Sequence, residues 1–211
     1  MQTNSRGFRA GGTGGSPLLL SGFGGLLFIA TFVALGFAVP GYSQLRDAIS
    51  ALEQTAMGPA QQANFFVFGV LQCVFALALG RELASGFGAK LIPIFQALAG
   101  AGVMGDAIFL HSAPHMACDL VAFNASMCVL LLFAWRVRKD TRWRGWATYS
   151  VATVLAMMAF LFAFGWMNAH VGPAGLMEKL ATTVRTLWSV VLAARLFSGV
   201  ELAPARPTPS Q

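Results

Sequence analysis

Charge is what this sequence has least of. Asp, Glu, Lys and Arg together make up 10% of the 211 residues, whereas a soluble globular domain carries about 25%. So few charges cannot cover a surface that faces water, which excludes a soluble enzyme. There are three cysteines and no CxxC spacing, which excludes a disulfide-rich secreted scaffold and a cysteine-based zinc site. Hydrophobic residues make up 56% of the chain, and this composition predicts a polytopic membrane protein.

Apolar runs long enough to cross a bilayer, about 20 residues each, occur six times. Pro and Gly punctuate their ends, as at Pro40-Gly41, Pro114 and Gly172-Pro173, where helices stop or start. The sequence therefore predicts an all-α fold, a six-transmembrane-helix bundle forming one domain over residues 17–198. Residues 1–16 and 199–211 are expected to be flexible cytoplasmic tails. The predicted spans are 17–39, 64–79 with room for a further turn at either end, 91–110, 115–135, 149–167 and 174–197.

The basic residues predict the orientation of the bundle. Eleven of the fourteen Lys and Arg residues fall on the side that carries both tails, whereas the opposite loops hold only Arg46, and Lys179 and Arg185 lie within the last span. Because loops rich in Lys and Arg stay in the cytoplasm, we expect both termini to be cytoplasmic, in a bacterial inner membrane. The net charge of +6 is then a topology signal, and no nucleic-acid partner is expected. The eleven residues are Arg6, Arg9, Arg81, Lys90, Arg136, Arg138, Lys139, Arg142, Arg144, Arg195 and Arg206.

The connection between the first two spans, residues 41–61, has a pattern of its own. Leu45, Ile49 and Leu52 recur at helical spacing, with charged and polar residues elsewhere around the wheel. This pattern predicts a short external amphipathic helix, lying on the outer membrane surface or capping the bundle.

Ionisable residues inside the spans are costly in a bilayer and are therefore the first candidates for function. His115 and Asp119 are four residues apart and share a helix face. Glu178 and Arg185 belong to a second polar stripe with Thr182 and Ser189. Such stripes turn inward, so we expect an outward-facing polar cavity. Its candidate ligand-binding residues are Ser50, Asn64, Asp106, His115, Asp119, Glu178, Lys179 and Arg185.

Each candidate group also has an ordinary structural interpretation. Asp106, His111, His115 and Asp119 are weak candidates for a divalent metal, but hydrogen-bonded polar groups explain them as well, and no metal or cofactor is expected. Ser50 could act as a nucleophile beside a histidine, or could be a surface serine. A structural ion-pair stripe and a binding site for an anionic head group are the two interpretations of Glu178, Lys179 and Arg185. A further alternative is that the carboxylate of Asp119 or Glu178 couples transport to proton movement.

Three stretches resemble the bacterial and archaeal membrane proteins of the domain-of-unknown-function family 998. In the first, Tyr42, Ile49-Ser50, Leu52, Gly58-Pro59, Asn64 and Gly69 resemble the family's Tyr…Ile-Ser-Glu-Leu-Gly…Asn…Gly pattern, although Ala51 and Glu53 depart from it. In the second, His115 opens a helix and Phe123 follows. In the third, Gly175, Glu178, Lys179 (where the family has Arg), Trp188 and Leu196 resemble the last helix. The resemblance implies six transmembrane helices and no established activity.

Three functions are compatible with these observations. The first is binding of a lipid or another small amphiphile in the cavity, with membrane lipids as the partners. The second is a membrane-embedded lipid hydrolase, with metal assistance if Asp106, His111, His115 and Asp119 hold an ion. The third is a small transporter, for which the sequence offers no midplane helix break. The oligomeric state is left open.

Overall fold

The computed structural model describes residues 15–83, 85–110 and 112–199, and all of its regular structure is helical. Six helices are long and apolar enough to cross a membrane, which confirms the predicted number of spans. They are α1 (Gly15–Ala38), α2 (Gly58–Leu83), α3 (Leu91–Ile108), α4 (Ala113–Val137), α5 (Trp146–Ala169) and α6 (Ala174–Phe197). Two short 3-10 helices complete the elements, η1 (Ile49–Gln54) and η2 (Thr141–Trp143).

The predicted boundaries agree with the structure at α6 and are too short at α2. That helix begins at Gly58 and ends at Leu83, whereas hydropathy predicts residues 64–79. The first turns of α2 hold Gln61 and Asn64, which lower the hydropathy of the segment, but Gln61 is fully buried against the rest of the bundle. The helix thus extends beyond its apolar run, through polar residues that are buried in the bundle.

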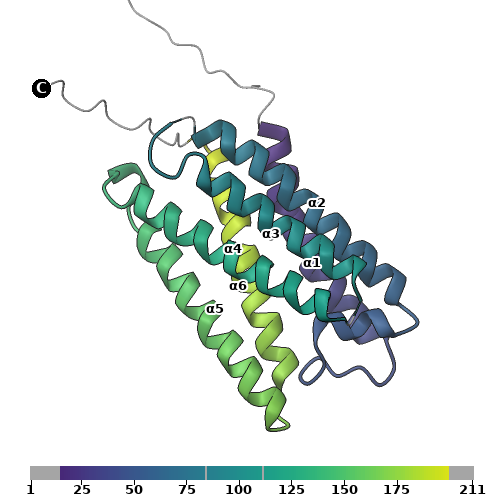
Figure 1. Ribbon diagram of the computed structural model, residues 1–211. Helices are drawn as coiled ribbons and strands as arrows, with labels where there is room; N and C mark the ends of the chain where they lie inside the picture. The colour runs from purple at the N-terminus through teal and green to yellow at the C-terminus, as the bar shows by residue number, and fades with distance from the viewer. Residues whose placement is uncertain (1–14, 84, 111, 200–211) are drawn as a thin grey trace, which may run out of the picture.

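The helices alternate in direction, so the start of α1 and the end of α6 lie at the same end of the bundle (Figure 1). The other end carries η1 and the α3–α4 and α5–α6 connections, and is called the η1 end below. The end opposite is called the basic end, because the α4–α5 connection there holds Arg138, Lys139 and Arg142. Helices α4 and α5 lie side by side at the basic end and diverge toward the η1 end (Figure 1).

Aromatic residues pack the basic end tightly. Phe133 meets Trp143 and Trp188 edge to face, with ring centroids 5.4 and 5.3 Å apart, and all three rings are buried. The indole N–H of Trp188 donates to Ser150 Oγ at 3.0 Å, so burial of this polar group is compensated. This cluster joins α4, η2, α5 and α6 into one core.

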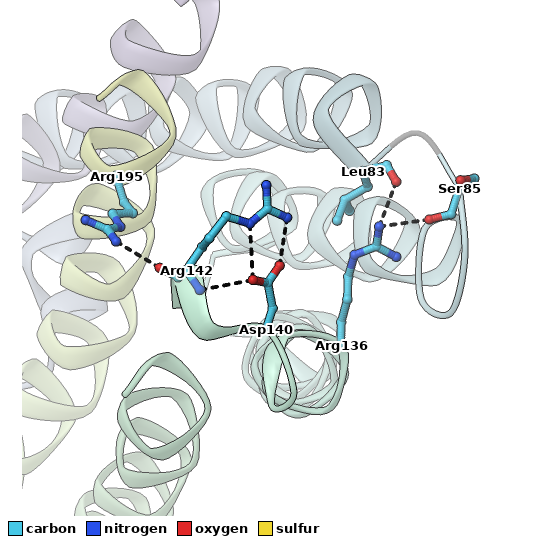
Figure 2. A network of polar contacts seen from close by, with 6 residues as sticks. All are labelled: Leu83, Ser85, Arg136, Asp140, Arg142 and Arg195. Carbon is cyan, nitrogen blue, oxygen red and sulfur yellow. Dashed lines mark hydrogen bonds and ion pairs between the residues drawn. The ribbon is translucent and has the colours of Figure 1, made fainter. Parts of the chain in front are cut away.

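Arginine side chains hydrogen-bond to the loops around that core (Figure 2). Arg136 donates to the carbonyl oxygens of Leu83 and Ser85 at 2.9 and 2.8 Å, which ties α4 to the α2–α3 connection. Arg142 makes a two-pronged contact with Asp140, and Arg195 of α6 donates to the Arg142 carbonyl oxygen at 3.0 Å. Much of the basic charge at this end therefore also holds loops in place.

The external segment contains a short helix, as expected, but its form differs from the expected amphipathic helix that begins near Leu45. Residues 43–47 form a turn, and a 3-10 helix follows over Ile49–Gln54. Leu45 is 55% exposed, whereas Ile49 and Leu52 are fully buried. The segment caps the η1 end of the bundle, because the polar groups of α6 hold its backbone, as described below.

Candidate functional site

The start of α6 holds the external segment through backbone contacts. Glu178 Oε2 accepts a hydrogen bond from the Ile49 N–H at 2.8 Å, and Lys179 Nζ donates to the Asp47 carbonyl oxygen at 2.5 Å. The N–H groups of Gly175 and Leu176 donate to the carbonyl oxygens of Arg46 and Leu45. A side chain at Gly175 would overlap the backbone of Asp47, so glycine permits this close approach. We call this set of contacts the η1–α6 dock.

Tyr42 completes the dock from the end of α1. Its hydroxyl donates to the carbonyl oxygens of Asp47 and Ala48, at 3.2 and 2.9 Å. Burial, and then the negative charges of Glu178 and Asp47, raise the pKa of Tyr42 well above its ordinary value. The phenol therefore stays protonated and remains a donor.

A second cluster joins α3 to α4 beside the dock. Asp106 lies near the end of α3, and His115 and Asp119 lie one turn apart at the start of α4. Asp106 and His115 are buried, and the Nε2 atom of His115 lies 3.7 Å from Asp119 Oδ2. One potential ligand atom from each of the three residues lies within 4.8 Å of the other two. We call these three residues the acidic triad.

The orientation of His115 is set by a backbone carbonyl. Its Nδ1 atom lies 3.2 Å from the carbonyl oxygen of Asp106. Since a carbonyl oxygen can only accept, this contact places the ring proton on Nδ1. The Nε2 atom is then the ring nitrogen that faces Asp119. A histidine held in this way is suited to binding a cation or taking up a proton.

Glu53 contributes a further carboxyl group from η1. Its side chain is 9% exposed. Burial, and then the negative charge of Asp119, raise the pKa of Glu53 to about 7. Glu53 is not among the site residues predicted from the sequence. Ser50 and Glu53 are three residues apart, a spacing at which side chains eclipse one another in a 3-10 helix.

Arg185 lies deeper, below the acidic triad. Its side chain carries a positive charge that interacts with Asp106 and Asp119, and its guanidinium carbon lies 5.1 Å from the centre of the Phe123 ring. One of its nitrogens lies 3.4 Å from Ser126 Oγ. Arg185 also lines a small recess of about 10 Å³, which has room for about one water molecule. The hydrogen-bonded side chains of Gln72 and Gln96 form part of its wall.

A cavity of about 530 Å³ opens where α4 and α5 diverge. Its polar lining gathers near the η1 end and includes the acidic triad's His115 and Asp119. Its apolar lining comes mainly from α4 and α5, and Met116 and Leu120 are more than 60% exposed on the outside of the bundle. The polar lining residues are Ser50, Ser112, His115, Asp119, Asn124 and Glu178, and the apolar ones are Ala48, Ala113, Met116, Leu120, Phe123, Met127, Leu161 and Phe164.

The structure thus divides the eight predicted site residues into three groups. Four line the cavity, namely Ser50, His115, Asp119 and Glu178. Asp106 and Arg185 adjoin it through the acidic triad. The other two make backbone contacts elsewhere: Lys179 in the dock, and Asn64, which donates to the Phe28 carbonyl oxygen and joins α2 to α1. His111 lies outside the described residues.

Six long apolar helices around a buried polar cluster define a polytopic helical membrane protein. Within that class, the chain belongs to the family described as Protein of unknown function (DUF998), whose model matches residues 23–195. Nothing matches among the curated proteins or the solved structures. The residues that resemble the family meet in space, because Tyr42, Ile49, Gly175 and Glu178 all belong to the η1–α6 dock.

Proposed function

We propose that the protein binds a lipid or another membrane amphiphile in the cavity between α4 and α5. The observation that carries the proposal is the division of the cavity lining, which is polar near the η1 end and apolar along α4 and α5. A volume of about 530 Å³ lies within the range of about 300–1,000 Å³ usual for small-molecule sites. It accommodates a head group and the first part of an acyl chain.

The position of the cavity supports an occupant that enters from the bilayer. Met116 and Leu120 contribute to the lining and are exposed on the outer face of α4, so the cavity opens sideways. In the orientation expected from the basic residues, the polar end lies at the outer leaflet. A lipid of that leaflet would enter with its chain already in hydrocarbon, and only its head group would exchange water for the polar lining.

Native mass spectrometry of the detergent-purified protein tests the proposal with a matched pair of variants. Leu161→Trp fills the apolar part of the cavity, whereas Phe162→Trp changes the adjacent residue, which is 76% exposed. We expect the wild type and Phe162→Trp to retain a bound amphiphile, and Leu161→Trp to lose at least about 90% of it, since the added ring occupies the chain site. Equal retention by both variants, or a wild type without retained lipid in several mild detergents, would overturn the proposal.

A lipid hydrolase is the second candidate. It is favoured by Ser50, His115 and Asp119 lining the same cavity, which places a hydroxyl, a base and a carboxylate around one ligand. The same spectra distinguish it from simple binding, because a hydrolase would retain a fatty acid or a lyso-lipid. No observation on the described residues favours a transporter, since the aromatic cluster of Phe133, Trp143 and Trp188 fills the basic end.

A further inference from the structure

The two aspartates of the acidic triad face the positive charge of one arginine. Glu53, Asp106 and Asp119 interact with one another electrostatically, and Arg185 supplies the positive charge that faces Asp106 and Asp119. With both aspartates ionised, the one guanidinium of Arg185 leaves an excess of one negative charge. In a buried site such an excess is compensated by protons or by a cation.

The geometry of the triad favours a cation. Asp106 is 2% exposed, and its Oδ1 atom has no hydrogen-bond partner among the described residues, although a buried carboxyl oxygen normally has one. The two aspartate side chains lie within hydrogen-bonding reach of each other, an arrangement that requires either a shared proton or a cation between them. The Nε2 atom of His115 completes the set, with its Nδ1 proton held by the Asp106 carbonyl oxygen.

The distances fit a first-row divalent ion. Ligands around tetrahedral Zn²⁺, with bonds of about 2.0–2.1 Å, lie about 3.3 Å apart. His115 Nε2 and Asp119 Oδ2 are 3.7 Å apart, and all three potential ligand atoms lie within 4.8 Å of one another. Bringing all three atoms onto one ion requires rotation of the two carboxylates to shorten these separations. Imidazole with two carboxylates is a ligand set that suits Zn²⁺ better than Ca²⁺ or Mg²⁺.

The geometry points to a Zn²⁺-type divalent cation site formed by Asp106, His115 and Asp119, with its fourth position open to the cavity. Asp106 forms the buried wall of the site, whereas His115 and Asp119 line the cavity. An open position beside three protein ligands is the arrangement of reactive or ligand-binding zinc sites. If the proposed function holds, that position takes an anionic oxygen of the amphiphile's head group, a phosphate or a carboxylate.

Zinc binding is measured on the full-length protein in detergent, stripped with chelator and titrated with Zn²⁺ by calorimetry and elemental analysis. We expect one Zn²⁺ per chain and a higher unfolding temperature in its presence, because the ion binds the folded state. His115→Gln and Asp119→Asn should weaken binding at least tenfold. His170→Gln is the matched control, since His170 stacks on Trp166 at the same end of the bundle and is exposed, and it should bind like the wild type.

Two results would overturn the cation site. One is a wild type that binds no stoichiometric Zn²⁺. The other is a His115→Gln protein that elutes as a single folded species and still binds Zn²⁺ with wild-type affinity. If His115→Gln does not fold, Asp119→Asn provides the same comparison, because that side chain is 38% exposed and the change removes only charge.

Lipid retention measured with and without Zn²⁺ separates this inference from the proposed function. Retention that rises at least tenfold with Zn²⁺ supports head-group ligation at the fourth position. Retention independent of Zn²⁺ in a protein that binds the ion contradicts that ligation and leaves lipid binding standing. Zn²⁺ binding without any retained lipid contradicts the proposed function and leaves the cation site standing.

Discussion

Glu178 and Asp119 both carry carboxylates in the first turns of a helix, but the two carboxylates contact different groups. Glu178 accepts the Ile49 N–H and so determines where η1 sits, although its side chain also reaches the cavity. Asp119 is 38% exposed, faces the cavity and lies 3.7 Å from His115. The same residue type is thus structural at one position and available to a ligand at the other, because backbone donors satisfy only the first.

At this residue scale, Glu53 makes stability depend on pH. Its pKa is raised from 4.5 to about 7 in the folded protein, so between these values the folded state holds a proton that the unfolded chain releases. Stability is therefore highest at low pH and falls as pH rises through this window. We expect the unfolding temperature of the wild type in detergent to fall between about pH 5 and about pH 8, and the neutral Glu53→Gln variant to show a smaller fall.

The control for this prediction lies at the basic end. Asp140→Asn changes a carboxylate that pairs with Arg142 far from η1, and it should show the same fall as the wild type. A Glu53→Gln protein whose unfolding temperature follows pH as steeply as the wild type would contradict the assignment to Glu53.

At the scale of elements, η1 depends on α6 for its position. The six-residue 3-10 helix has no side-chain cap of its own; it gains its order from Glu178, Lys179 and the buried Ile49 and Leu52. Short 3-10 helices have weak internal hydrogen bonds. The dock therefore decides whether the external segment is ordered over the cavity.

Removing the acceptor at position 178 should loosen η1. In Glu178→Ala the Ile49 N–H loses its partner, and we expect a cost of about 1–3 kcal/mol together with faster hydrogen exchange over residues 49–54. Glu178→Gln keeps a carbonyl acceptor and should recover most of the protection. Exchange measured by mass spectrometry compares the three proteins; equal rates in Glu178→Ala and the wild type would show that η1 is held by packing alone.

At the scale of the whole molecule, the two ends of the bundle are built differently. The basic end is closed by buried aromatic rings and arginine contacts to loop carbonyls (Figure 2). The η1 end holds the carboxylates, the histidine and the cavity. The orientation expected from the basic residues would place the closed end in the cytoplasm.

Thiol labelling in whole cells tests that orientation. In a background with Cys73, Cys118 and Cys128 replaced by Ala, Gln54→Cys in η1 should react with a membrane-impermeant maleimide in intact cells. Lys139→Cys at the basic end should react only after permeabilisation; both positions are exposed. The reverse pattern would place the cavity on the cytoplasmic side and contradict the proposed outer-leaflet occupant.

The sequence by itself determined the class of protein and the six spans, and it pointed to His115, Asp119 and Glu178, which line one cavity, because hydropathy and i,i+4 spacing are local properties of a helix. It could not assign Lys179 and Asn64 to backbone contacts, nor bring Glu53 together with Asp119. Those relations depend on how α2, α6 and η1 pack, and the partners of Lys179 and Glu53 are distant in the chain. The tertiary structure also decided where the cavity lies, since its lining comes from η1, α4, α5 and α6 together.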